Sequence, residues 1–390
     1  MREICARKKC CGCSACAQAC PVGCIALVED AEGFLCPEID QGKCINCGKC
    51  KRVCPIVNDR PKRRPVAEYA YRTKDRELLR KTSSGGFFSL AATKVLERGG
   101  VVFGAAFNDQ HEVVHKYVDS IEELDTLRRS KYVQSHTGTS FVDCKRFLDS
   151  GRLVLFCGTP CQVKALNLFL GRSYDNLVSI DFVCHGVPSP GVFKRYLNDL
   201  AQNKQRAIGE LHAINFRDKS LNYSYSFAFA FAQNHFVENP RENVFLRGFL
   251  SDLYLRRSCY CCQAKGFSSG ADYTMCDFWG LQKVLSGFPS TDIPGVSQVF
   301  VLYDKLLLFA QVEDNADVQQ VNVSVRNAIP RLAYKSTPAT RRRERFFARY
   351  RNGEPIYEIV SALSDMSYFE MAIRQPRAFA GMILRRIGLR

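Results

Sequence analysis

Several features are scarce or missing in this sequence of 390 residues. The opening residues, MREICARKKCCGC, contain no apolar stretch and no cleavage site typical of a secretory signal peptide, so we do not expect secretion. No run of about eighteen apolar residues occurs, so no segment is expected to cross a bilayer. Acidic residues are also few, because 39 Asp and Glu stand against 55 Lys and Arg. The formal net charge of +16 favours an acidic partner.

The basic excess is scattered along the chain apart from three short runs, and no repeat of aromatic and basic residues accompanies it. Nucleic-acid binding is therefore not expected. What the sequence does have is cysteine, with 20 in all. Without a signal peptide we expect the reducing cytoplasm, where clustered cysteines more often bind metal or carry out redox chemistry than form disulfides.

The cysteines near the N-terminus follow a repeated spacing. CCGCSACAQACP and CINCGKCKRVCP align cysteine for cysteine, and each contains C-x2-C-x2-C-x3-C-P. This spacing is typical of bacterial proteins with two 4Fe-4S clusters, because three thiolates two residues apart surround one cubane while the fourth ligates the other. We therefore predict one cluster on Cys10, Cys13, Cys16 and Cys54, and a second on Cys44, Cys47, Cys50 and Cys20.

Zinc is the alternative for such cysteine pairs, but the ordered triplets followed by Cys-Pro fit a cubane better. Four further cysteines fall outside the spacing and are interpreted as packing residues around the clusters: Cys5, Cys11, Cys24 and Cys36. Residues 1–57 are thus predicted to form a two-cluster ferredoxin-type domain. Residues 58–65, NDRPKRRP, have the composition of a linker.

Beyond the linker, patterns typical of helices and strands alternate. FFSLAATKVLERGG and CKRFLDSGR predict helices, VVFGAAF, RLVLF and LVSIDFVC predict strands, and GTPCQVKALNLFLG predicts a turn into a helix. SYSFAFAFAQ alternates polar and apolar residues, which indicates an antiparallel strand or hairpin. The expected fold class is therefore α+β and α/β, with a mixed α/β body after the ferredoxin-like module.

The segment from about residue 338 is basic and predicted to be helical, and it ends in FAGMILRRIGLR. Such a tail is able to lie on a membrane surface. The alternative, favoured by the usual behaviour of charge runs, is a helix packed on the body with solvated arginines.

Motifs of the body carry a family resemblance. KTSSGGFF, RRSKYVQS, VLFCGTPCQVKAL, DFVCHGVPSP, FRDK, RRSCYCC and CDFWG occur in this order, and together they resemble the coenzyme F420 hydrogenase/dehydrogenase beta-subunit family. The resemblance implies a flavin, usually FAD, beside iron-sulfur clusters. It also implies electron exchange between one-electron carriers and a two-electron substrate, which the family name does not identify.

The resemblance divides the body into a flavin-binding region at residues 66–148, a C-terminal domain at 149–337 and the basic tail at 338–390. It also implies the flavin contacts. The small-residue turn at a helix start favours a phosphate, since bare backbone N–H groups point outward there. In the SKY segment, Lys131 would neutralise flavin charge and Tyr132 would stack. The predicted contacts are Ser83, Ser84, Gly85, Gly86, Ser130, Lys131, Tyr132 and Gln134.

A third 4Fe-4S cluster is predicted in the body, where family members carry one. Cys161 and Cys184 follow two predicted strands, at the edge where α/β proteins bind ligands, and Cys259 and Cys262 form a C-x2-C pair. The competing cysteines are Cys157, Cys261 and Cys276. Any of this set is alternatively a small buried hydrophobic residue.

His185 is the candidate catalytic acid-base residue, because imidazole titrates near neutrality and flavin reduction needs a proton. A structural role for His185 is equally open. Asp277 or Asp181 is able to orient it or to cap a helix, and the FRDK segment binds an anionic substrate or forms salt bridges.

The sequence therefore predicts an iron-sulfur flavoprotein oxidoreductase that passes electrons from a ferredoxin or another electron-transfer protein to FAD, and then to F420 or a substrate of polysaccharide synthesis. Two alternatives stay open. One is a non-catalytic subunit that feeds electrons to a partner enzyme, and the other is a cluster-bearing scaffold for an envelope-polysaccharide complex.

Overall fold

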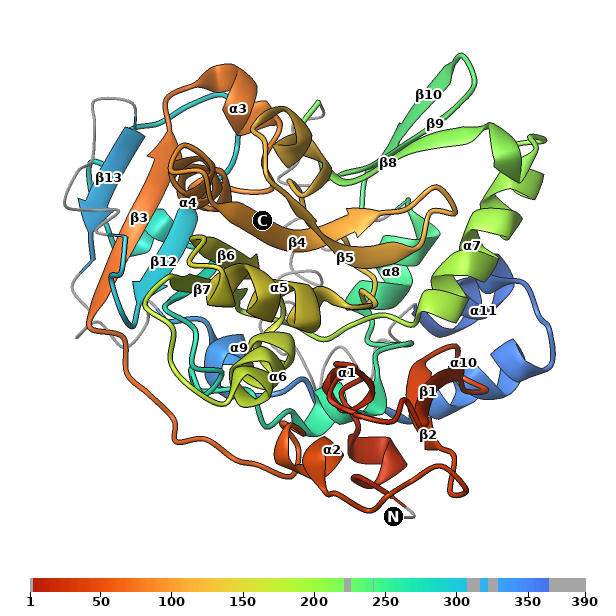
Figure 1. The fold of residues 1–390 in the computed structure, drawn as a ribbon. Coiled ribbons are helices and arrows are strands. Elements are labelled where there is room, and N and C mark those ends of the chain that lie inside the picture. Colours follow the sequence, from red (N-terminus) through yellow and green to blue (C-terminus); the bar gives the residue numbers. More distant parts are fainter. Residues whose placement is uncertain (1–2, 221–225, 241, 307–315, 322–328, 365–390) are drawn as a thin grey trace.

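The computed structural model describes residues 3–220, 226–240, 242–306, 316–321 and 329–364. It shows a small N-terminal module lying against a larger α/β body (Figure 1). The module contains η1 (Arg7–Lys9), α1 (Ala15–Gln18), an antiparallel hairpin of β1 (Ile25–Glu29) and β2 (Leu35–Ile39), and α2 (Lys49–Arg52). The predicted fold class, a ferredoxin-like module followed by a mixed α/β body, is confirmed.

The two sequence repeats of the module have the same backbone conformation. The short helices α1 and α2 occupy equivalent positions, and each is preceded by a residue in the left-handed region, Ser14 with φ 61° and Gly48 with φ 73°. Two residues earlier in each repeat, Gly12 with φ 69° and Asn46 with φ 54° are again equivalent. The repeated spacing is therefore a repeated loop geometry that wraps each cysteine triplet around one point.

The predicted linker crosses the surface of the body before the first strand of the large sheet, β3 (Ala67–Thr73). Two contacts hold it there. Asp59 accepts a hydrogen bond of 3.1 Å from the Nζ of Lys164, and Arg63 donates one of 2.6 Å to the Tyr303 hydroxyl. The linker is therefore held against the body rather than extended into solvent.

The body is built on a mixed sheet whose described strands run in the order β13-β3-β12-β11-β7-β6-β4-β5. The central strands β4, β6, β7 and β11 are parallel, whereas the outer pairs are antiparallel. Both predicted regions, 66–148 and 149–337, supply strands to it. Besides β3, the strands of this sheet are β4 (Val101–Phe107), β5 (Val113–Val118), β6 (Val154–Cys157), β7 (Leu177–Phe182), β11 (Tyr273–Asp277), β12 (Ser297–Val301) and β13 (Ala316–Gln320).

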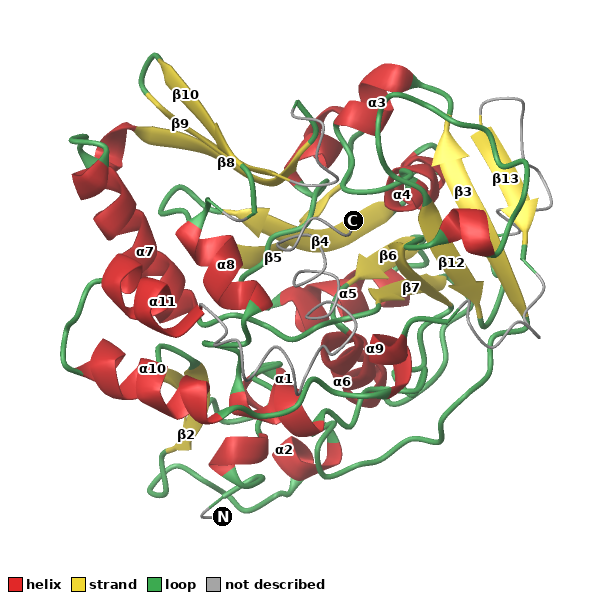
Figure 2. Cartoon of the chain, turned by 180° about the vertical axis from the view of Figure 1, so that it is seen from behind, coloured by secondary structure: helices red, strands yellow, loops and turns green. Residues whose placement is uncertain are grey.

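Helices cover both faces of this sheet (Figure 2). On β4 and β6, Phe103 and Phe156 pack with α5 (Ser140–Asp149) and α6 (Pro160–Leu170), whereas Val102 and Leu155 face the opposite core with α4 (Phe87–Leu96). Alternate residues of buried parallel strands are thus apolar on both sides, as such strands require. The expected helices and strands of this region are present within a few residues of their predicted positions.

A three-stranded antiparallel sheet lies beside the large one: β8 (Leu211–Asp218), β9 (Ser226–Phe231) and β10 (Asn234–Glu238). The predicted antiparallel strand in SYSFAFAFAQ is β9, and both of its faces are buried. Its core includes α7 (Pro190–Asn203), α8 (Val244–Leu250), α10 (Arg341–Arg351) and α11 (Ile356–Ser364). Shorter elements complete the body: α3 (Arg76–Arg80), η2 (Glu122–Thr126), η3 (Ile208–Glu210), η4 (Arg257–Cys261), η5 (Leu281–Lys283) and α9 (Arg331–Tyr334).

The basic helix of the predicted tail is α10, and it packs on the body as the second interpretation expected. Its arginines are not all solvated, however. Arg343 is 2% exposed, and its Nη2 lies 2.5 Å from Oε2 of Glu32 in the module. The helix therefore fastens the module to the body. Residues 365–390, with FAGMILRRIGLR, lie outside the described residues. In the described ranges, no helix combines the length and apolar character that crossing a membrane requires.

Candidate functional site

The structure brings the predicted cysteine quartets of the module together in two cavities. The inner cavity, which faces the body, is lined by Cys10, Cys13, Cys16 and Cys54. The outer cavity, on the far side of the module, is lined by Cys20, Cys44, Cys47 and Cys50. In each cavity the fourth cysteine comes from the other sequence repeat. This is the crossed arrangement that two-cluster modules need.

The cysteines outside the spacing lie directly beside these quartets. Cys5 lines the inner cavity beside Cys10, and its thiol lowers the pKa of Cys10 to about 6. The same thiol lowers the pKa of Cys54 to about 7. Cys24 lies 3.4 Å from Cys20, sulfur to sulfur. These neighbours favour the thiolate form of Cys10, Cys20 and Cys54, which is the form that binds metal.

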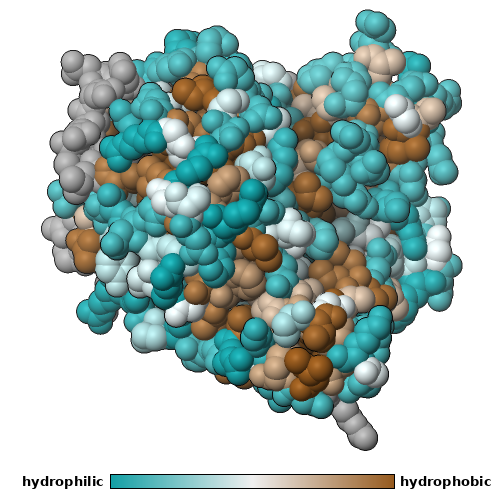
Figure 3. All heavy atoms as spheres, viewed as in Figure 1, coloured by the Kyte–Doolittle hydropathy of each residue, from teal (hydrophilic) through white to brown (hydrophobic). Residues whose placement is uncertain are grey.

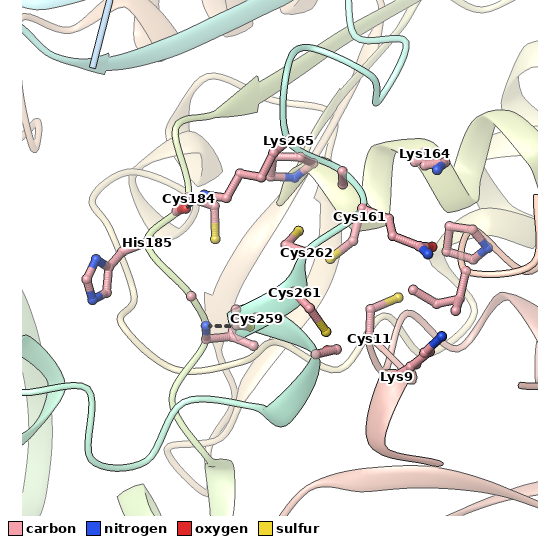
Figure 4. A pocket seen from close by; sticks show the side chains of 18 residues that line it. Lys9, Cys11, Cys161, Lys164, Cys184, His185, Cys259, Cys261, Cys262 and Lys265 are labelled. Carbon is pink, nitrogen blue, oxygen red and sulfur yellow. Dashed lines mark hydrogen bonds between the residues drawn. The ribbon is translucent and has the colours of Figure 1, made fainter. Parts of the chain in front are cut away.

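The predicted body cysteines converge on one cavity of about 160 Å³ (Figure 4). Cys161 begins α6 just after strand β6, Cys184 follows β7, and η4 carries Cys259 and leads to Cys262. Figure 4 shows these side chains around a common space together with Cys261. Cys157 and Cys276 line a different cavity, so the structure separates these two competitors from the predicted set.

Burial keeps the body thiols protonated in the absence of a positive centre. It raises the pKa of Cys259 to about 12 and that of Cys262 to about 11. Iron reverses this preference, because a bound cation stabilises the thiolate. Among the residues that the structure describes, no three His, Cys, Asp or Glu side chains are grouped closely enough for one metal ion. A cubane differs in that it spreads its ligands around a larger centre, and an enclosed space ringed by cysteines fits such a group.

The module contributes a cysteine to the body cavity. Cys11 lines this cavity together with Cys161, and it also lines the inner cavity of the module together with Cys13. The nearby Cys13 thiol and burial raise the pKa of Cys11. Sequence spacing assigned Cys11 to packing only. One signal in the sequence was available. Cys11 directly follows Cys10, whereas the second repeat has Ile45 at the position that matches Cys11.

Arg256 joins the same region. It is 4% exposed, and it donates hydrogen bonds to the backbone oxygen of Cys10 at 2.7 Å and to the side-chain oxygen of Gln134 at 2.9 Å. Its guanidinium also lies 3.3 Å from the Cys36 sulfur. A buried cation between two groups of cysteines offsets the negative charge that iron-sulfur clusters would place there. Arg256 is the first residue of the quoted RRSCYCC motif, but the sequence predicted no role for it.

A larger cavity of about 440 Å³ lies at the carboxyl ends of the parallel strands. Its wall includes Cys157 and Gly158 after β6, the segment from Phe182 to Pro188 after β7, and Asp277 at the end of β11. Such an edge is where open α/β sheets bind ligands. The volume lies within the range of cofactor and ligand pockets.

Six of the eight predicted flavin contacts line this large cavity: Ser83, Ser84, Gly86, Ser130, Lys131 and Tyr132. The other two do not. Gly85 is packed against the sheet, where an added Cβ would lie 2.0 Å from the backbone oxygen of Tyr71. Gln134 instead donates a hydrogen bond of 2.9 Å to the backbone oxygen of Cys11. These two residues therefore serve packing and the module interface.

Basic residues give the large cavity a positive wall. Arg217 from the FRDK segment forms a salt bridge of 2.8 Å with Asp277, and it donates a 3.1 Å hydrogen bond to the Tyr132 hydroxyl. Burial, together with the charge of Arg129, lowers the pKa of Lys131 to about 7. The buried Nε of Arg129 has no hydrogen-bond partner among the described residues. A phosphate would satisfy this donor, so the residues present fit a dinucleotide flavin.

His185 connects the two body cavities. The segment from Cys184 to Val187 lines both of them, and the His185 ring turns away from the cysteines (Figure 4). Its Nε2 donates a 2.6 Å hydrogen bond to Asp252. The predicted orienting residues are elsewhere, because Asp277 pairs with Arg217 and Asp181 accepts from Thr274 at 2.5 Å. Asp252 was missed because it belongs to none of the recognised motifs.

Comparison with known proteins adds two sequence matches. Residues 151–322 match a family model that describes the C-terminal part of the beta subunit of coenzyme F420 hydrogenase/dehydrogenase. The similarity to this beta-subunit family thus covers residues 151–322 of the body. Residues 37–57 match the 4Fe-4S binding domain, which covers the second cysteine quartet. The predicted family resemblance is thus confirmed.

The beta-subunit match spans β6 to β13, with the body cysteines and the far wall of the large cavity. The F420-reducing NiFe hydrogenase complex from Methanosarcina barkeri, in a xenon derivative, is a similar solved structure. It is 15% identical at a TM-score of 0.44, and the match covers 77% of this chain and 91% of that chain. No curated protein matches this chain.

Proposed function

We propose that this chain is an iron-sulfur flavoprotein oxidoreductase. A ferredoxin-like donor supplies single electrons to 4Fe-4S clusters on the module, and a two-electron acceptor is reduced at a flavin in the large cavity. The observation that carries the proposal is that the inner cavity shares lining residues with the body cavity, and the body cavity shares lining residues with the large cavity. Cys11 belongs to both the inner cavity and the body cavity, and the Cys184–Val187 segment belongs to both the body cavity and the large cavity.

The proposed ligands follow from this arrangement. Cys10, Cys13, Cys16 and Cys54 would hold the inner cluster, and Cys20, Cys44, Cys47 and Cys50 the outer one. Cys161, Cys184, Cys259 and Cys262 would hold a third in the body. Cys261 is exposed, whereas the other four are partly buried, so those four are the better set.

FAD is the proposed cofactor of the large cavity, because a flavin accepts electrons singly and releases them in pairs. Gly86 lies at the N-terminus of α4, whose free backbone N–H groups favour a phosphate. Arg129 and Lys131 would bind further negative charge, and Ser83 and Ser130 border the same wall. For each acceptor reduced, two one-electron donors are oxidised and one proton is taken up.

His185 is the proposed proton donor. It lines the large cavity, where a proton must accompany the electron pair, and Asp252 holds its ring in one orientation. Asp252 is therefore a positioning residue. The acceptor stays open between F420 and a substrate of polysaccharide synthesis, because the name of the family refers to the coenzyme without identifying the substrate of this chain.

Anaerobic purification with iron, sulfide and flavin quantitation tests the proposal. We expect about twelve irons and about one flavin per chain, from three four-iron clusters and one flavin site. About eight irons would remove the body cluster from the proposal. Protein that is colourless, and that gives no paramagnetic signal after reduction, would refute the function as a whole.

The family model describes a subunit, and this favours a second candidate in which the chain feeds electrons to a partner enzyme. Stable co-purification with a partner that itself binds the substrate would support this candidate. Acceptor reduction by the isolated chain would support an autonomous oxidoreductase.

A further inference from the structure

The two repeats of the module present equivalent positions to different surroundings. In the first repeat, Cys11 is 8% exposed and Ala15 is fully buried, because α1 packs on α5 and α6 of the body. The equivalent residues of the second repeat are Ile45, which is 62% exposed, and Lys49, which is also exposed. The body therefore covers a face at the first repeat that the second repeat leaves open.

The relationship extends to the residues after each quartet, in crossed order. Pro55 and Ile56, which follow the second quartet, line the body cavity. Their equivalents after the first quartet are Pro21 and Val22, which line the outer cavity, and Val22 is 41% exposed. The inner cavity thus borders the body cavity through residues of one face of the module. The equivalent residues beside the outer cavity lie on the molecular surface.

We propose that this open face docks an acidic one-electron carrier protein, which rests on the electron-transfer function proposed above. The docking face consists of Val22, Lys43, Ile45, Lys49, Lys51 and Arg52. The docking face lies beside the outer cavity in the same way that the body lies beside the inner cavity. The pseudo-symmetry of the two repeats therefore makes this face the expected position of a redox partner. The outer cavity also has the one cysteine of the eight proposed module ligands that is exposed, Cys47.

Charge identifies the partner. Residues 41–53, QGKCINCGKCKRV, contain four basic residues and no acidic one. Asp40, directly before them, pairs with Lys43 at 3.6 Å, so Lys49, Lys51 and Arg52 supply the excess positive charge of the face. In the first repeat, the equivalents of Lys49, Lys51 and Arg52 are Ala15, Ala17 and Gln18. The permanently covered face is therefore neutral, whereas the open one is basic. A cluster beneath the surface would lower this excess without reversing it, and charges around a contact speed the encounter with an oppositely charged protein.

The face also has an apolar centre, since Ile45 and Val22 are exposed beside the cations. Figure 3 shows apolar residues gathered on the N-terminal end of the molecule and bordered by hydrophilic ones. A small apolar centre with a charged rim is typical of the brief contacts that electron carriers make. An extended apolar area, as in permanent subunit interfaces, is not needed here.

The test uses the full chain with its clusters and flavin, in stopped-flow reduction. Lys49→Glu, Lys51→Glu and Arg52→Glu are combined in one variant, and the reductants are an acidic bacterial ferredoxin and reduced methyl viologen, a small cation. We expect the second-order rate constant with ferredoxin to fall at least about tenfold at low salt. Added salt should slow the wild-type reaction but hardly change that of the variant.

Reduced methyl viologen should reduce the variant at least as fast as wild type, since a small cation needs no docking face and is attracted by the added carboxylates. The matched control combines Arg98→Glu, Lys194→Glu and Arg206→Glu, three exposed cations of the body, and it should react with ferredoxin almost as fast as wild type. Iron content confirms that each variant is folded.

The possible outcomes separate the two proposals. An unchanged ferredoxin rate in the docking-face variant, with normal viologen reduction, would overturn the docking face and leave the function standing. Equal slowing in the control variant would also overturn it, because net charge alone would then explain the effect. Failure of viologen to reduce the iron-sulfur centres of wild type would overturn the function itself.

Discussion

Cys11 and Cys161 line one cavity, although the first belongs to the N-terminal module and the second to the body. Cys11 is also the chain neighbour of Cys10, a proposed ligand of the inner cluster. One peptide bond and one shared cavity therefore connect the two groups of cysteines. This connection joins a proposed ligand of the module to a proposed ligand of the body, and it supports the proposed route of electrons between them.

Replacing Cys11 by serine tests this connection. We expect Cys11→Ser to keep about twelve irons per chain, because four other cysteines are available at each cavity. Electron transfer from the module to the flavin should slow several-fold. A smaller and less polarisable oxygen atom would replace the sulfur between the inner cavity and the body cavity. Iron quantitation and stopped-flow flavin reduction measure the two effects.

Cys144→Ser is the matched control, because Cys144 is a fully buried cysteine in the core around α5. It should leave the rate of flavin reduction unchanged. If Cys11→Ser instead loses about four irons, Cys11 is a ligand and the proposed body quartet needs revision.

The body quartet is tested by comparing two cysteines. Cys259→Ser should lower iron by about four per chain and slow flavin reduction, because it removes a proposed ligand. Cys276→Ser should leave iron unchanged, since Cys276 lines the large cavity and hydrogen-bonds to Gln298. Unchanged iron in Cys259→Ser would exclude that residue as a ligand.

The ion pair between Glu32 and Arg343 should stabilise the docked module. Both side chains are nearly buried, at 11% and 3% exposure, so Arg343→Met leaves a buried carboxylate with only Arg257 beside it. We expect a loss of about 3 kcal/mol in unfolding free energy. Thermal unfolding and proteolysis of the linker at residues 58–65 report it. A variant as stable as wild type would show that Arg257 alone suffices.

The same pair predicts a pH dependence. Burial acts to raise the pKa of Glu32, but hydrogen bonds and charge from Arg343 and Arg257 outweigh it and hold the pKa below 4.5. A lowered carboxyl pKa stabilises the fold above the ordinary pKa, and the effect is lost as pH falls through the lowered value. Wild type and Arg343→Met should therefore approach equal stability in acid.

Asp252 should act on catalysis through His185. Asp252→Asn should keep iron and flavin but slow acceptor reduction about tenfold or more, and change its pH profile, because the imidazole loses its orienting carboxylate. His185→Gln should be similarly slow, and the double variant hardly slower than either. Thr337→Val removes the 2.9 Å hydrogen bond to the other Asp252 oxygen and serves as the control. Additive effects would mean that the two residues act separately.

Lys131 should make flavin binding depend on pH. Its pKa is lowered to about 7 by burial, and a bound phosphate or flavin anion would favour the protonated form. FAD affinity should therefore rise as pH falls from about 9 to about 6, with proton uptake. Fluorescence titration of flavin-free protein measures this, and Lys131→Met should bind more weakly without the pH dependence. An equal pH dependence of FAD affinity in wild type and Lys131→Met would exclude Lys131 as the titrating group.

Without flavin, the stability of the fold should change with pH in the opposite direction to FAD affinity. The unfolded chain binds a proton at Lys131 up to its ordinary pKa of 10.5, whereas the folded chain loses it near 7. Stability should therefore rise with pH across this interval. At neutral pH, Lys131→Met should be the more stable protein.

The sequence by itself determined the local geometry of this protein. The ligand triplets could be predicted because each lies within a few residues, and the duplicated loop gives both triplets the same backbone. The alternation of helices and strands around residues 87–182 was equally predictable, since apolar periodicity reports directly on burial. The edge of the sheet that follows Cys157 and Phe182 was predicted for the same reason.

Only the tertiary structure decided which distant residues meet. Cys161, Cys184, Cys259 and Cys262 were predicted to converge, but spacing alone did not separate them from Cys157 and Cys276. It gave no indication of the Asp252 contact to His185, of the Arg256 contact to Cys10, or of Gln134 facing the module instead of the flavin. Such contacts join segments more than a hundred residues apart in most cases, so they depend on how whole elements pack, and a one-dimensional spacing carries no information about that packing.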